Sequence, residues 1–392
     1  MKEGWAYKKL GEVCDFEGGS QPPKSEWINH PQNGYVRMLQ IRDFTKSRNA
    51  EIEYVKITKK LRLCKDDDIL IGRYGASVGK ILTGLAGAYN VAIIKSIPNE
   101  ELIRKDFIRR YFESSLFQSI LFKVCTSRAA QAGFSKDDIK DELIPVPPLS
   151  EQQSIVDYLD SAFAKIDAMK ANAEKALNEA KALFQASLKE MLEPKEGWEE
   201  KKLKEVVASI TDGDHQPPPK SDDGIPFITI SNIDKNSNKI VFGETFYVPQ
   251  SYYCALKKDR IPQQGDVLYT VTGSFGIPVL VDFQKEFCFQ RHIALIRPNM
   301  GLLSSTYLFY WILSSYATSQ AEDTATGAAQ RTVSLNSLRN FTINFPPLSV
   351  QQSIVETLDS LKSKVDRLQE NYDKISQECD ALKQAILRQV FE

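Results

Sequence analysis

Two glycine-rich runs hold the side chains with the clearest chemical potential in this sequence. They are Gly72–Lys80 and, later in the chain, Thr270–Gly276. A phosphate-binding P-loop needs G-x-x-x-x-G-K followed by Ser or Thr, so that backbone amides and the lysine can hold the phosphates. The residue five positions before Gly79 is Tyr74, and Ile81 follows the lysine, so the nucleotide-binding interpretation fails at both places.

Such loops suit contact with DNA instead. Glycine lets a backbone approach closely, arginine pairs with guanine, and small hydroxyl groups can bond to base edges. A second recurring run, Thr126–Gln131 and Thr326–Arg331, contains small residues together with Gln and Arg. Gln can make two hydrogen bonds to one adenine, and Arg can make two to one guanine. Two simpler interpretations stay open, a β-turn for the first run and a helix end with a polar loop for the second. The predicted DNA contacts are Arg73, Tyr74, Ser77, Lys80, Arg128, Gln131, Thr272, Ser274, Gln290, Arg291, Gln330 and Arg331.

The sequence offers no catalytic centre and no metal site. Its three histidines, His30, His215 and His292, are too few and too scattered for a metal site or a catalytic triad. The run Asp212–His215 contains ligand-type side chains, but the corresponding run of the first half, Glu17–Ser20, does not, which favours a capped turn. Neither a G-x-S-x-G nor an H-E-x-x-H motif occurs.

Composition bounds the cellular setting and the mode of binding. The six cysteines of the 392 residues form no C-x-x-C motif, and no run of about 18 to 20 apolar residues occurs, so we expect a reducing cytoplasm and no membrane span. The net charge is only -1, with a mildly basic first block. A protein that holds DNA alone usually carries a strongly basic surface, because phosphate neutralisation supplies most non-specific affinity. We therefore expect a partner to help hold the DNA.

An internal repeat organises the chain. Pro147–Val156 reads P-P-L-S-E-Q-Q-S-I-V, and Pro346–Val355 reads P-P-L-S-V-Q-Q-S-I-V. Each run closes a variable block that opens with E-G-W, at Trp5 or Trp198, and each opens a heptad-patterned stretch. The predicted domains are two globular blocks, 1–147 and 194–345, and two long helices, 148–193 and 346–392.

The two heptad stretches predict a coiled coil within one chain. Taking Ser150 and Ser349 as N-caps makes Gln153 and Gln352 the partners of capping boxes. Apolar residues then recur at steps of four and three, which keeps one seam of each helix toward a partner helix. The side chains of the expected first seam are mostly small and those of the second are large, so the two helices can pack without voids. We therefore expect them to pair antiparallel, and each helix to be about 60 Å long. The alternative is that each helix covers its own domain. The expected seams are Ile155, Leu159, Ala162, Ile166, Met169, Ala173, Ala176, Ala180 and Leu183, against Ile354, Leu358, Leu361, Val365, Leu368, Tyr372, Ile375, Cys379, Leu382 and Ile386.

Each globular block reads as a mixed α+β domain. Strand-like runs at 35–41, 69–71 and 91–94 recur at 227–230, 267–269 and 293–296, and an amphipathic helix follows in both blocks, around Phe107 and around Tyr307. The predicted fold class is α+β, with two similar globular domains separated by a long intramolecular antiparallel coiled coil of two helices, pseudo-twofold overall.

The whole chain resembles the specificity (S) subunit of type I restriction-modification systems. The resemblance rests on the two P-P-L-S-x-Q-Q helix starts, on Thr211–His215, and on the G-D-V-L strand entry at Gly265–Leu268. The first half departs from it, with Asp67 in place of that glycine and Glu17–Ser20 in place of the D-G-D-H turn.

The resemblance implies a non-catalytic subunit whose two target-recognition domains each read one half of a bipartite, asymmetric DNA target. It also implies two methyltransferase (M) subunits and restriction (R) subunits as partners beside double-stranded DNA. S-adenosylmethionine, ATP and Mg²⁺ would then belong to those subunits and none to this chain. The alternative function is a coiled-coil scaffold with two protein-binding domains, and a third, less favoured possibility is an enzyme with unfamiliar motifs.

Overall fold

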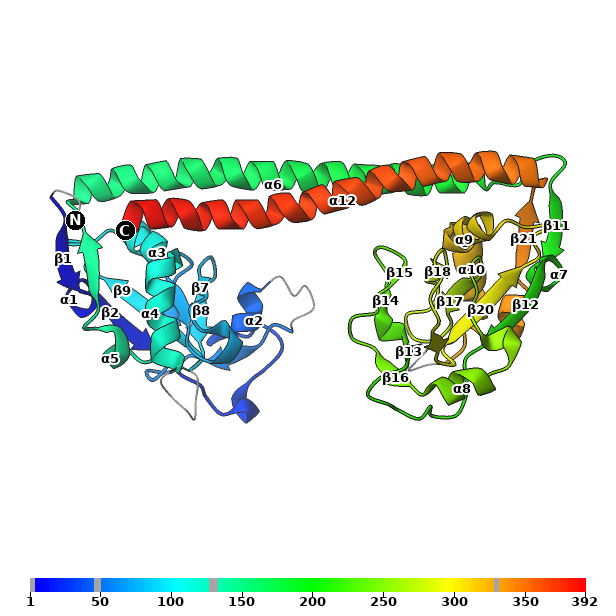
Figure 1. The fold of residues 1–392 in the computed structure, drawn as a ribbon. Coiled ribbons are helices and arrows are strands. Elements are labelled where there is room, and N and C mark those ends of the chain that lie inside the picture. Colours follow the sequence, from blue (N-terminus) through cyan, green and yellow to red (C-terminus); the bar gives the residue numbers. More distant parts are fainter. Residues whose placement is uncertain (1–3, 46–50, 127–132, 328–330) are drawn as a thin grey trace. The chain divides into compact units, whose positions relative to one another are not determined.

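The computed structural model describes residues 4–45, 51–126, 133–327 and 331–392. The chain divides into two compact units, and each contains one globular block with parts of both long helices (Figure 1). Unit 1 comprises Met1–Asn172 and Lys374–Glu392, and unit 2 comprises Ala173–Asp373. Within the described residues, no helix combines the length and the apolar character that crossing a membrane requires.

The globular block of unit 1 contains two four-stranded sheets in its described residues. The first sheet has the order β2-β9-β6-β7 with antiparallel neighbours, and the second has the order β4-β3-β8-β5. A separate pair, β1 and β10, joins the start of the block to its end. The strands are β1 Ala6–Lys9, β2 Cys14–Gly18, β3 Tyr35–Leu39, β4 Tyr54–Lys56, β5 Leu63–Cys64, β6 Leu70–Gly72, β7 Ile81–Leu82, β8 Gly87–Tyr89, β9 Ile93–Pro98 and β10 Leu143–Val146. The main helices are α3 Lys105–Glu113, α4 Ser115–Thr126 and α6 Leu149–Met191, with short turns at α1 Leu10–Val13, η1 Lys24–Glu26, α2 Ile41–Phe44, η2 Gly75–Ser77 and α5 Lys136–Ile139.

Unit 2 repeats the same order of main elements. Its sheet β12-β20-β17-β18 corresponds to β2-β9-β6-β7, and β11 pairs with β21 as β1 does with β10. The strands are β11 Glu199–Lys202, β12 Val207–Asp212, β13 Ile225–Ile228, β14 Ile233–Asp234, β15 Lys239–Ile240, β16 Phe246–Val248, β17 Val267–Thr270, β18 Pro278–Leu280, β19 Cys288–Phe289, β20 Ile293–Pro298 and β21 Thr342–Phe345. The helices are α7 Leu203–Val206, η3 Ile230–Asn232, α8 Gln250–Ala255, η4 Lys258–Arg260, α9 Ser305–Leu313, α10 Ser315–Thr324, α11 Leu335–Arg339 and α12 Leu348–Phe391.

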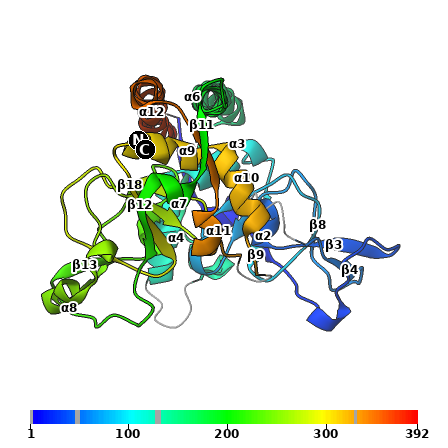
Figure 2. The same ribbon diagram turned by 90° about the vertical axis from the view of Figure 1, so that its right-hand side faces the viewer.

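The α+β prediction is confirmed, with shifts at the ends of elements. The strand expected at 35–41 ends at Leu39, because the capping-box turn of α2 begins at Gln40. The expected helix around Tyr307 is α9, which lies between α12 and the sheet of unit 2 (Figures 1 and 2). Its residues Tyr307 to Ile312 are all buried, so this helix is apolar on every side rather than amphipathic.

A buried glutamine explains the repeated P-P-L-S-x-Q-Q motif. Gln152 is fully buried, and its Oε1 accepts from the backbone N–H of Arg104 at 2.7 Å. Its Nε2 donates to the carbonyls of Leu102 and Pro147, at 3.1 and 2.8 Å. The amide thus ties the start of α6, the proline turn and the loop before α3 together with no hydrogen-bonding capacity left unused on its nitrogen.

The second copy repeats this clamp atom for atom. Gln351, also fully buried, accepts from the N–H of Ser304 at 2.9 Å and donates to the carbonyls of Leu302 and Pro346, both at 2.8 Å. Because the same three bonds form in both units, the first glutamine of each motif has a structural role.

The predicted capping boxes are wrong. α6 begins at Leu149 and α12 at Leu348, so Ser150 and Ser349 already lie inside the helices. Gln153, the expected box partner, donates to Asp157 at 2.7 Å, and Gln352 donates to Glu356 at 3.0 Å. Pro148 and Pro347 occupy the N-cap positions instead, because their carbonyls accept the first helical hydrogen bonds.

In each unit the two long helices pack antiparallel, as predicted. In unit 1, Asp167 pairs with Lys383 at 2.5 Å and Lys170 with Asp380 at 3.4 Å, so the residue number falls on one helix as it rises on the other. In unit 2, Lys181 donates to Gln369 at 2.7 Å. The helices also pack on the globular blocks. Because each helix contacts the other as well, the alternative in which each helix only covers its own domain is wrong.

The expected seam of the first helix is partly wrong. Leu159 and Ile166 are buried as predicted, but Met169 and Leu183 are 59% and 60% exposed. Ala176 is exposed as well. Buried side chains lie one position later than Ile155, Ala162, Ala176 and Leu183, and they are Val156, Phe163, Leu177 and Phe184. The second seam holds except at Leu382, which is 47% exposed. The larger side chains decide the choice, because Phe163 and Phe184 also pack on the globular blocks.

Candidate nucleic-acid interface

One edge of the main sheet in unit 1 gathers the predicted contact loops. β2 and β6 both pair antiparallel with β9, so the ends of β2 and β6 lie at the same edge as the start of β9. We call the residues at this place the loop edge of unit 1: 18–20, 73–80, 90–92 and 133–134. The backbone at Gly19 lies very close to that at Asn90, because a Cβ on Gly19 would lie 2.0 Å from the carbonyl oxygen of Asn90.

The structure places the glycine-rich loop of unit 1 beside the described residues that follow the second recurring run. Tyr74 of the glycine-rich loop forms an antiparallel bridge with Gly133, which follows the second run. Arg73 strengthens the junction, because its Nε donates to the carbonyl of Phe134 at 3.1 Å and its Nη1 to that of Val91 at 3.4 Å. These donors are therefore engaged, and Arg73 holds the loop edge together in the free protein.

The other candidates of this loop are more accessible. Tyr74 is 41% exposed, with the guanidinium of Arg73 5.1 Å from its ring centroid, and Lys80 is exposed. Ser77 lies half-buried in the turn η2. Gln118 of α4 supports the loop from behind, because its Nε2 donates to the carbonyl of Gly79 at 2.9 Å. The loop thus presents Tyr74 and Lys80 outward from a braced backbone.

Unit 2 has a loop edge at the equivalent place: residues 212–215, 271–277, 290–292 and 331–332. The ends of β12 and β17 meet the start of β20 there, since both strands pair antiparallel with β20. Thr272 forms an antiparallel bridge with Thr332, as Tyr74 does with Gly133 in unit 1. The N–H of Gly273 also donates to the carbonyl of Arg331 at 2.9 Å. Both units therefore assemble the same pair of segments.

The candidate side chains of unit 2 differ in accessibility. Thr272 is only 7% exposed, and its hydroxyl accepts from that of Thr332 at 3.4 Å, so it supports the edge. Ser274 is exposed. Arg331 is exposed too, but its Nη2 donates to the carbonyl of Glu322 at 2.7 Å and its guanidinium lies 5.3 Å from the ring centroid of Phe275.

Gln290 and Arg291 lie at the turn before β20. Gln290 is half-buried and bridges to Asp214, while Arg291 is exposed. The Nε of Arg291 donates to Nε2 of His292 at 3.3 Å. Burial, and then the charge of Arg291, lowers the pKa of His292, so its imidazole is neutral at pH 7 and can accept this bond. Of the remaining candidates, Arg128, Gln131 and Gln330 lie outside the described residues.

An ion-pair cluster at the loop edge of unit 2 was not among the predicted site residues. Asp212 forms an ion pair with Arg260 at 3.5 Å and a hydrogen bond with the ring of His215 at 2.9 Å, and Arg260 lies 3.9 Å from Asp214. The hydroxyl of Tyr252 donates to Asp214 at 3.3 Å. The D-G-D-H turn therefore binds a guanidinium of its own chain. Across the described parts of the chain, no group of three or more His, Cys, Asp or Glu is arranged to hold a metal ion.

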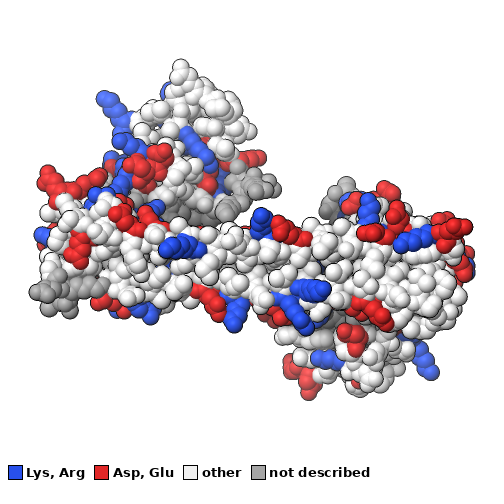
Figure 3. Space-filling model, turned by 90° about the horizontal axis from the view of Figure 1, so that it is seen from above, with Lys and Arg blue, Asp and Glu red and all other residues white. Residues whose placement is uncertain are grey.

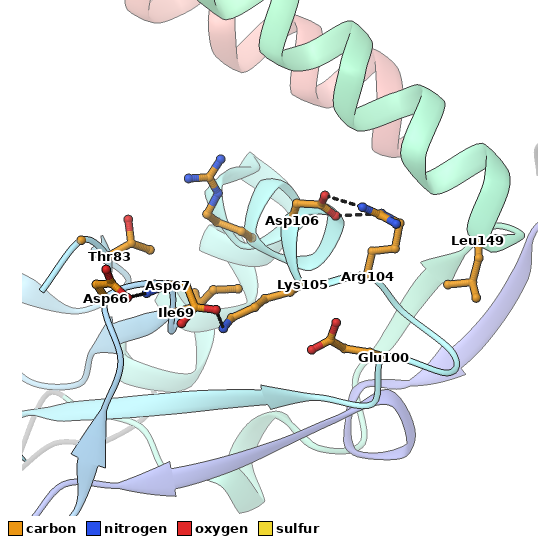
Figure 4. Close-up of a pocket in the computed structure, with 11 residues that line it drawn as sticks. Asp66, Asp67, Ile69, Thr83, Glu100, Arg104, Lys105, Asp106 and Leu149 are labelled. Atoms are coloured by element: carbon orange, nitrogen blue, oxygen red, sulfur yellow. Dashed lines mark hydrogen bonds and ion pairs between the residues drawn. The ribbon is translucent and has the colours of Figure 1, made fainter. Parts of the chain in front are cut away.

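A charged hollow of about 550 Å³ lies elsewhere in unit 1 (Figure 4). It is bounded by the start of α3, by the β5–β6 connection and by Leu149. Lys105 donates to Asp67 at 2.8 Å and holds the pKa of that carboxyl below its usual range. Arg104 and Asp106 form a two-bonded pair at 3.1 and 2.9 Å. These four charged side chains are therefore paired within the wall of the hollow.

A buried threonine holds the contact loop of unit 2, and its replacement tests that support. Thr270 is fully buried; its hydroxyl donates to the carbonyl of Ser274 at 2.8 Å and accepts from the N–H of Ile277 at 3.0 Å. Thr270→Val keeps the shape and removes both bonds, so we expect a loss of about 1–3 kcal/mol in unfolding free energy by denaturant titration. Thr270→Ser keeps the hydroxyl and should recover most of it, whereas equal losses in both variants would exclude the hydrogen bonds as the cause.

Comparison with known proteins identifies the class. The family model of the type I restriction modification DNA specificity domain matches residues 2–179 and 195–377. The EcoBI specificity subunit of Escherichia coli is 22% identical over 417 residues, covering 100% of this chain and 86% of its own length. The MjaVIII specificity subunit of Methanocaldococcus jannaschii is 23% identical, covering 93% of this chain and 88% of its own length.

Solved structures agree in fold. A chain from a study of complex assembly and conformational transition in a type I restriction-modification system has a TM-score of 0.75 at 19% identity, covering 100% of this chain and 98% of that chain. The HsdS subunit of Thermoanaerobacter tengcongensis has a TM-score of 0.51 at 19% identity, covering 100% of this chain and 97% of that chain. The chain therefore belongs to the family of type I restriction-modification specificity subunits, with two target-recognition domains. Such a subunit is the non-catalytic member of a methyltransferase and endonuclease complex.

Proposed function

We propose that each globular block reads one half of a bipartite, asymmetric DNA target through its loop edge. One observation carries this proposal: the two loop edges have the same backbone framework but expose different side chains. Both edges are built by the same strand ends and the same bridge, Tyr74–Gly133 or Thr272–Thr332. The exposed side chains differ between them, with Tyr74 and Lys80 in one and Ser274 and Arg291 in the other. Two similar frames with different groups suit two different half-sites.

The functional division is into segments 1–147, 148–193, 194–345 and 346–392, in which the two long helices space the blocks and receive partners. Two methyltransferase subunits are the proposed partners of the helices, and restriction subunits join the complex. Leu149 and Leu348 support this role, since they occupy the same place in the two helix starts and both are 41% exposed. One repeated apolar side chain suits two copies of one partner.

Charge supports shared binding of DNA with these partners. The face that carries α6 and α12 mixes Lys and Arg with Asp and Glu and shows no continuous basic surface (Figure 3). With a net charge of -1, the chain alone binds its target weakly, and the methyltransferase subunits complete the phosphate contacts. S-adenosylmethionine, ATP and Mg²⁺ are bound by those partner subunits and not by this chain, and the complex works in the cytoplasm.

Exchange of one block tests the function. Residues 1–147 are replaced by the corresponding block of another family member, and methylated sites are mapped by single-molecule sequencing in cells that also make the methyltransferase subunit. We expect one half of the methylated target to change while the other half stays. An unchanged target would favour the scaffold with protein-binding domains, and methylation by the purified chain without a partner would reveal an enzyme.

A further inference from the structure

A short basic run occurs at the same place in both blocks. Lys59-Lys60-Leu61-Arg62 precedes β6, and Lys257-Lys258-Asp259-Arg260 precedes β17. The register is fixed by a matching turn, in which Asp68 accepts from the N–H of Lys65 at 2.9 Å and Asp266 from that of Gln263 at 2.7 Å. The two arginines therefore occupy equivalent positions, although the surrounding sequences differ.

Both arginines are tied to their loop edges. The guanidinium of Arg62 pairs with Glu17, next to the edge, at 2.8 Å, and its backbone N–H donates to the hydroxyl of Ser20 at 3.0 Å. Arg260 makes the corresponding contacts with Asp212 and Asp214 at 3.5 and 3.9 Å. A carboxylate beside each edge would repel a DNA phosphate, and the paired arginine offsets that repulsion.

The lysines of the runs are free to meet a ligand. All four side chains are exposed, and within the described parts of the chain none of their ammonium groups has a hydrogen-bond or ion-pair partner: Lys59, Lys60, Lys257 and Lys258. Exposed cations that pair with nothing in the free protein keep their full charge for an external anion, and a flexible ammonium suits a phosphate as a point charge.

The duplication indicates what the runs recognise. The two half-sites of an asymmetric target differ in their bases but share one component, the sugar-phosphate backbone. A contact that is the same in both blocks therefore suits the backbone, while the side chains that differ suit the bases. We infer that the two K-K-x-R runs are paired phosphate clamps, one on each side of the target, which set affinity without selecting sequence. This inference rests on the proposed reading of DNA by both loop edges.

The salt dependence of binding tests the clamps. Lys257→Gln/Lys258→Gln is compared with the unchanged chain, each assembled with its methyltransferase subunits, by titrating labelled target DNA from 50 to 200 mM salt. Two lost phosphate contacts should make the slope of log affinity against log salt shallower by about 2. Binding should weaken by the same factor on target and on unrelated DNA, and the mapped methylation sequence should stay unchanged.

A matched variant removes the same charge elsewhere in unit 2. Lys235 follows β14 and Lys285 lies between β18 and β19, so Lys235→Gln/Lys285→Gln should keep the original slope. An unchanged slope in the Lys257/Lys258 variant would overturn the inference. A changed methylated sequence would also overturn it, since the lysines would then read bases, and so would loss of assembly with the methyltransferase subunits before DNA is added.

These outcomes are distinct from failure of the proposed function, because exchange of a block tests sequence choice while the salt slope tests phosphate contact. The equivalent variant in unit 1, Lys59→Gln/Lys60→Gln, should give the same change in slope. A large effect in one unit only would contradict the idea of paired clamps. The exposed lysines have no folding role, and an unchanged thermal unfolding curve of each variant confirms this.

Discussion

Phe391→Ala is expected to lower the unfolding free energy of unit 1 by about 3–5 kcal/mol, although this residue lies far along the sequence from the rest of that core. Phe391 is 3% exposed and packs edge-on against Phe107 and Tyr111, with ring centroids 5.4 and 5.5 Å apart. Its loss leaves a cavity beneath α3, because rigid neighbouring rings cannot close over the space.

Amide hydrogen exchange measures this effect by region. In Phe391→Ala, exchange should become faster in α3 and α4 of unit 1, while α9 and α10 of unit 2 serve as an internal reference. Arg388→Ala is the control, since its side chain is 59% exposed and, among the residues that the structure describes, forms an ion pair only with Glu392, so a change of less than about 0.5 kcal/mol is expected. Equal protection of α3 in the variant and the unchanged chain would show that the end of α12 does not belong to this core.

Gln152→Ala is the second large effect, with an expected loss of about 2–4 kcal/mol. The substitution leaves the N–H of Arg104 and the carbonyls of Leu102 and Pro147 without their partner in a fully buried place. Because a buried polar group without a hydrogen bond costs its full desolvation, the joint between helix and block should loosen. Gln351→Ala should have a similar effect in unit 2.

The neighbouring glutamines provide matched controls. Gln153 and Gln352 stand next in the same motif, but each donates only to an acidic side chain one turn later on the helix surface. Gln153→Ala and Gln352→Ala should therefore change the unfolding free energy by no more than about 0.5 kcal/mol in denaturant titrations. If both glutamines of one motif proved equally sensitive, burial of the first would not be the cause.

Most of what could be predicted about the fold came from the internal repeat. Two copies of one motif, each followed by a heptad pattern, define two blocks and two helices before any contact is known. The antiparallel pairing was predicted correctly, but the expected reason was wrong. The buried side chains of the first helix include Phe163, Leu177 and Phe184, so its seam is not made of small residues.

The exact seam could not be predicted, because the sequence contains two interleaved four-three patterns. Both include Leu159 and Ile166, and they differ in the alternate positions, such as Ala162 or Phe163. In the structure Phe163 is the buried residue, and the guanidinium carbon of Arg110 in the globular block lies 4.8 Å from the centroid of its ring. The selection therefore depends on a tertiary contact that spacing along one helix does not contain. The caps failed for a related reason, because Ser150 has the right residue type but Pro148 already begins the helix.

The sequence indicated which loops form the candidate site, but not which of their side chains face outward. Recurrence in both halves identified the glycine-rich runs, whose residues Tyr74 and Thr272 form bridges to Gly133 and Thr332, just beyond the second runs. Whether a side chain faces outward depends on carbonyl groups far away in the sequence. Arg73 donates to Phe134 and Val91, and Thr272 is buried, which no local pattern indicates. Arg62 and Arg260 were missed because neither lies in a glycine-rich run, although the repeated K-K-x-R spacing was available as a signal.

The place of Phe391 in unit 1 also determines the order in which the chain can mature on the ribosome. The strands and helices of the first block are translated early, but the core of that unit includes Cys379, Leu387 and Phe391, which follow the whole of unit 2 in the chain. Unit 2 draws on Ala173–Asp373 alone, so its residues are all available before those three are translated. We therefore expect the core of unit 1 to be completed after that of unit 2, although its globular block is translated first.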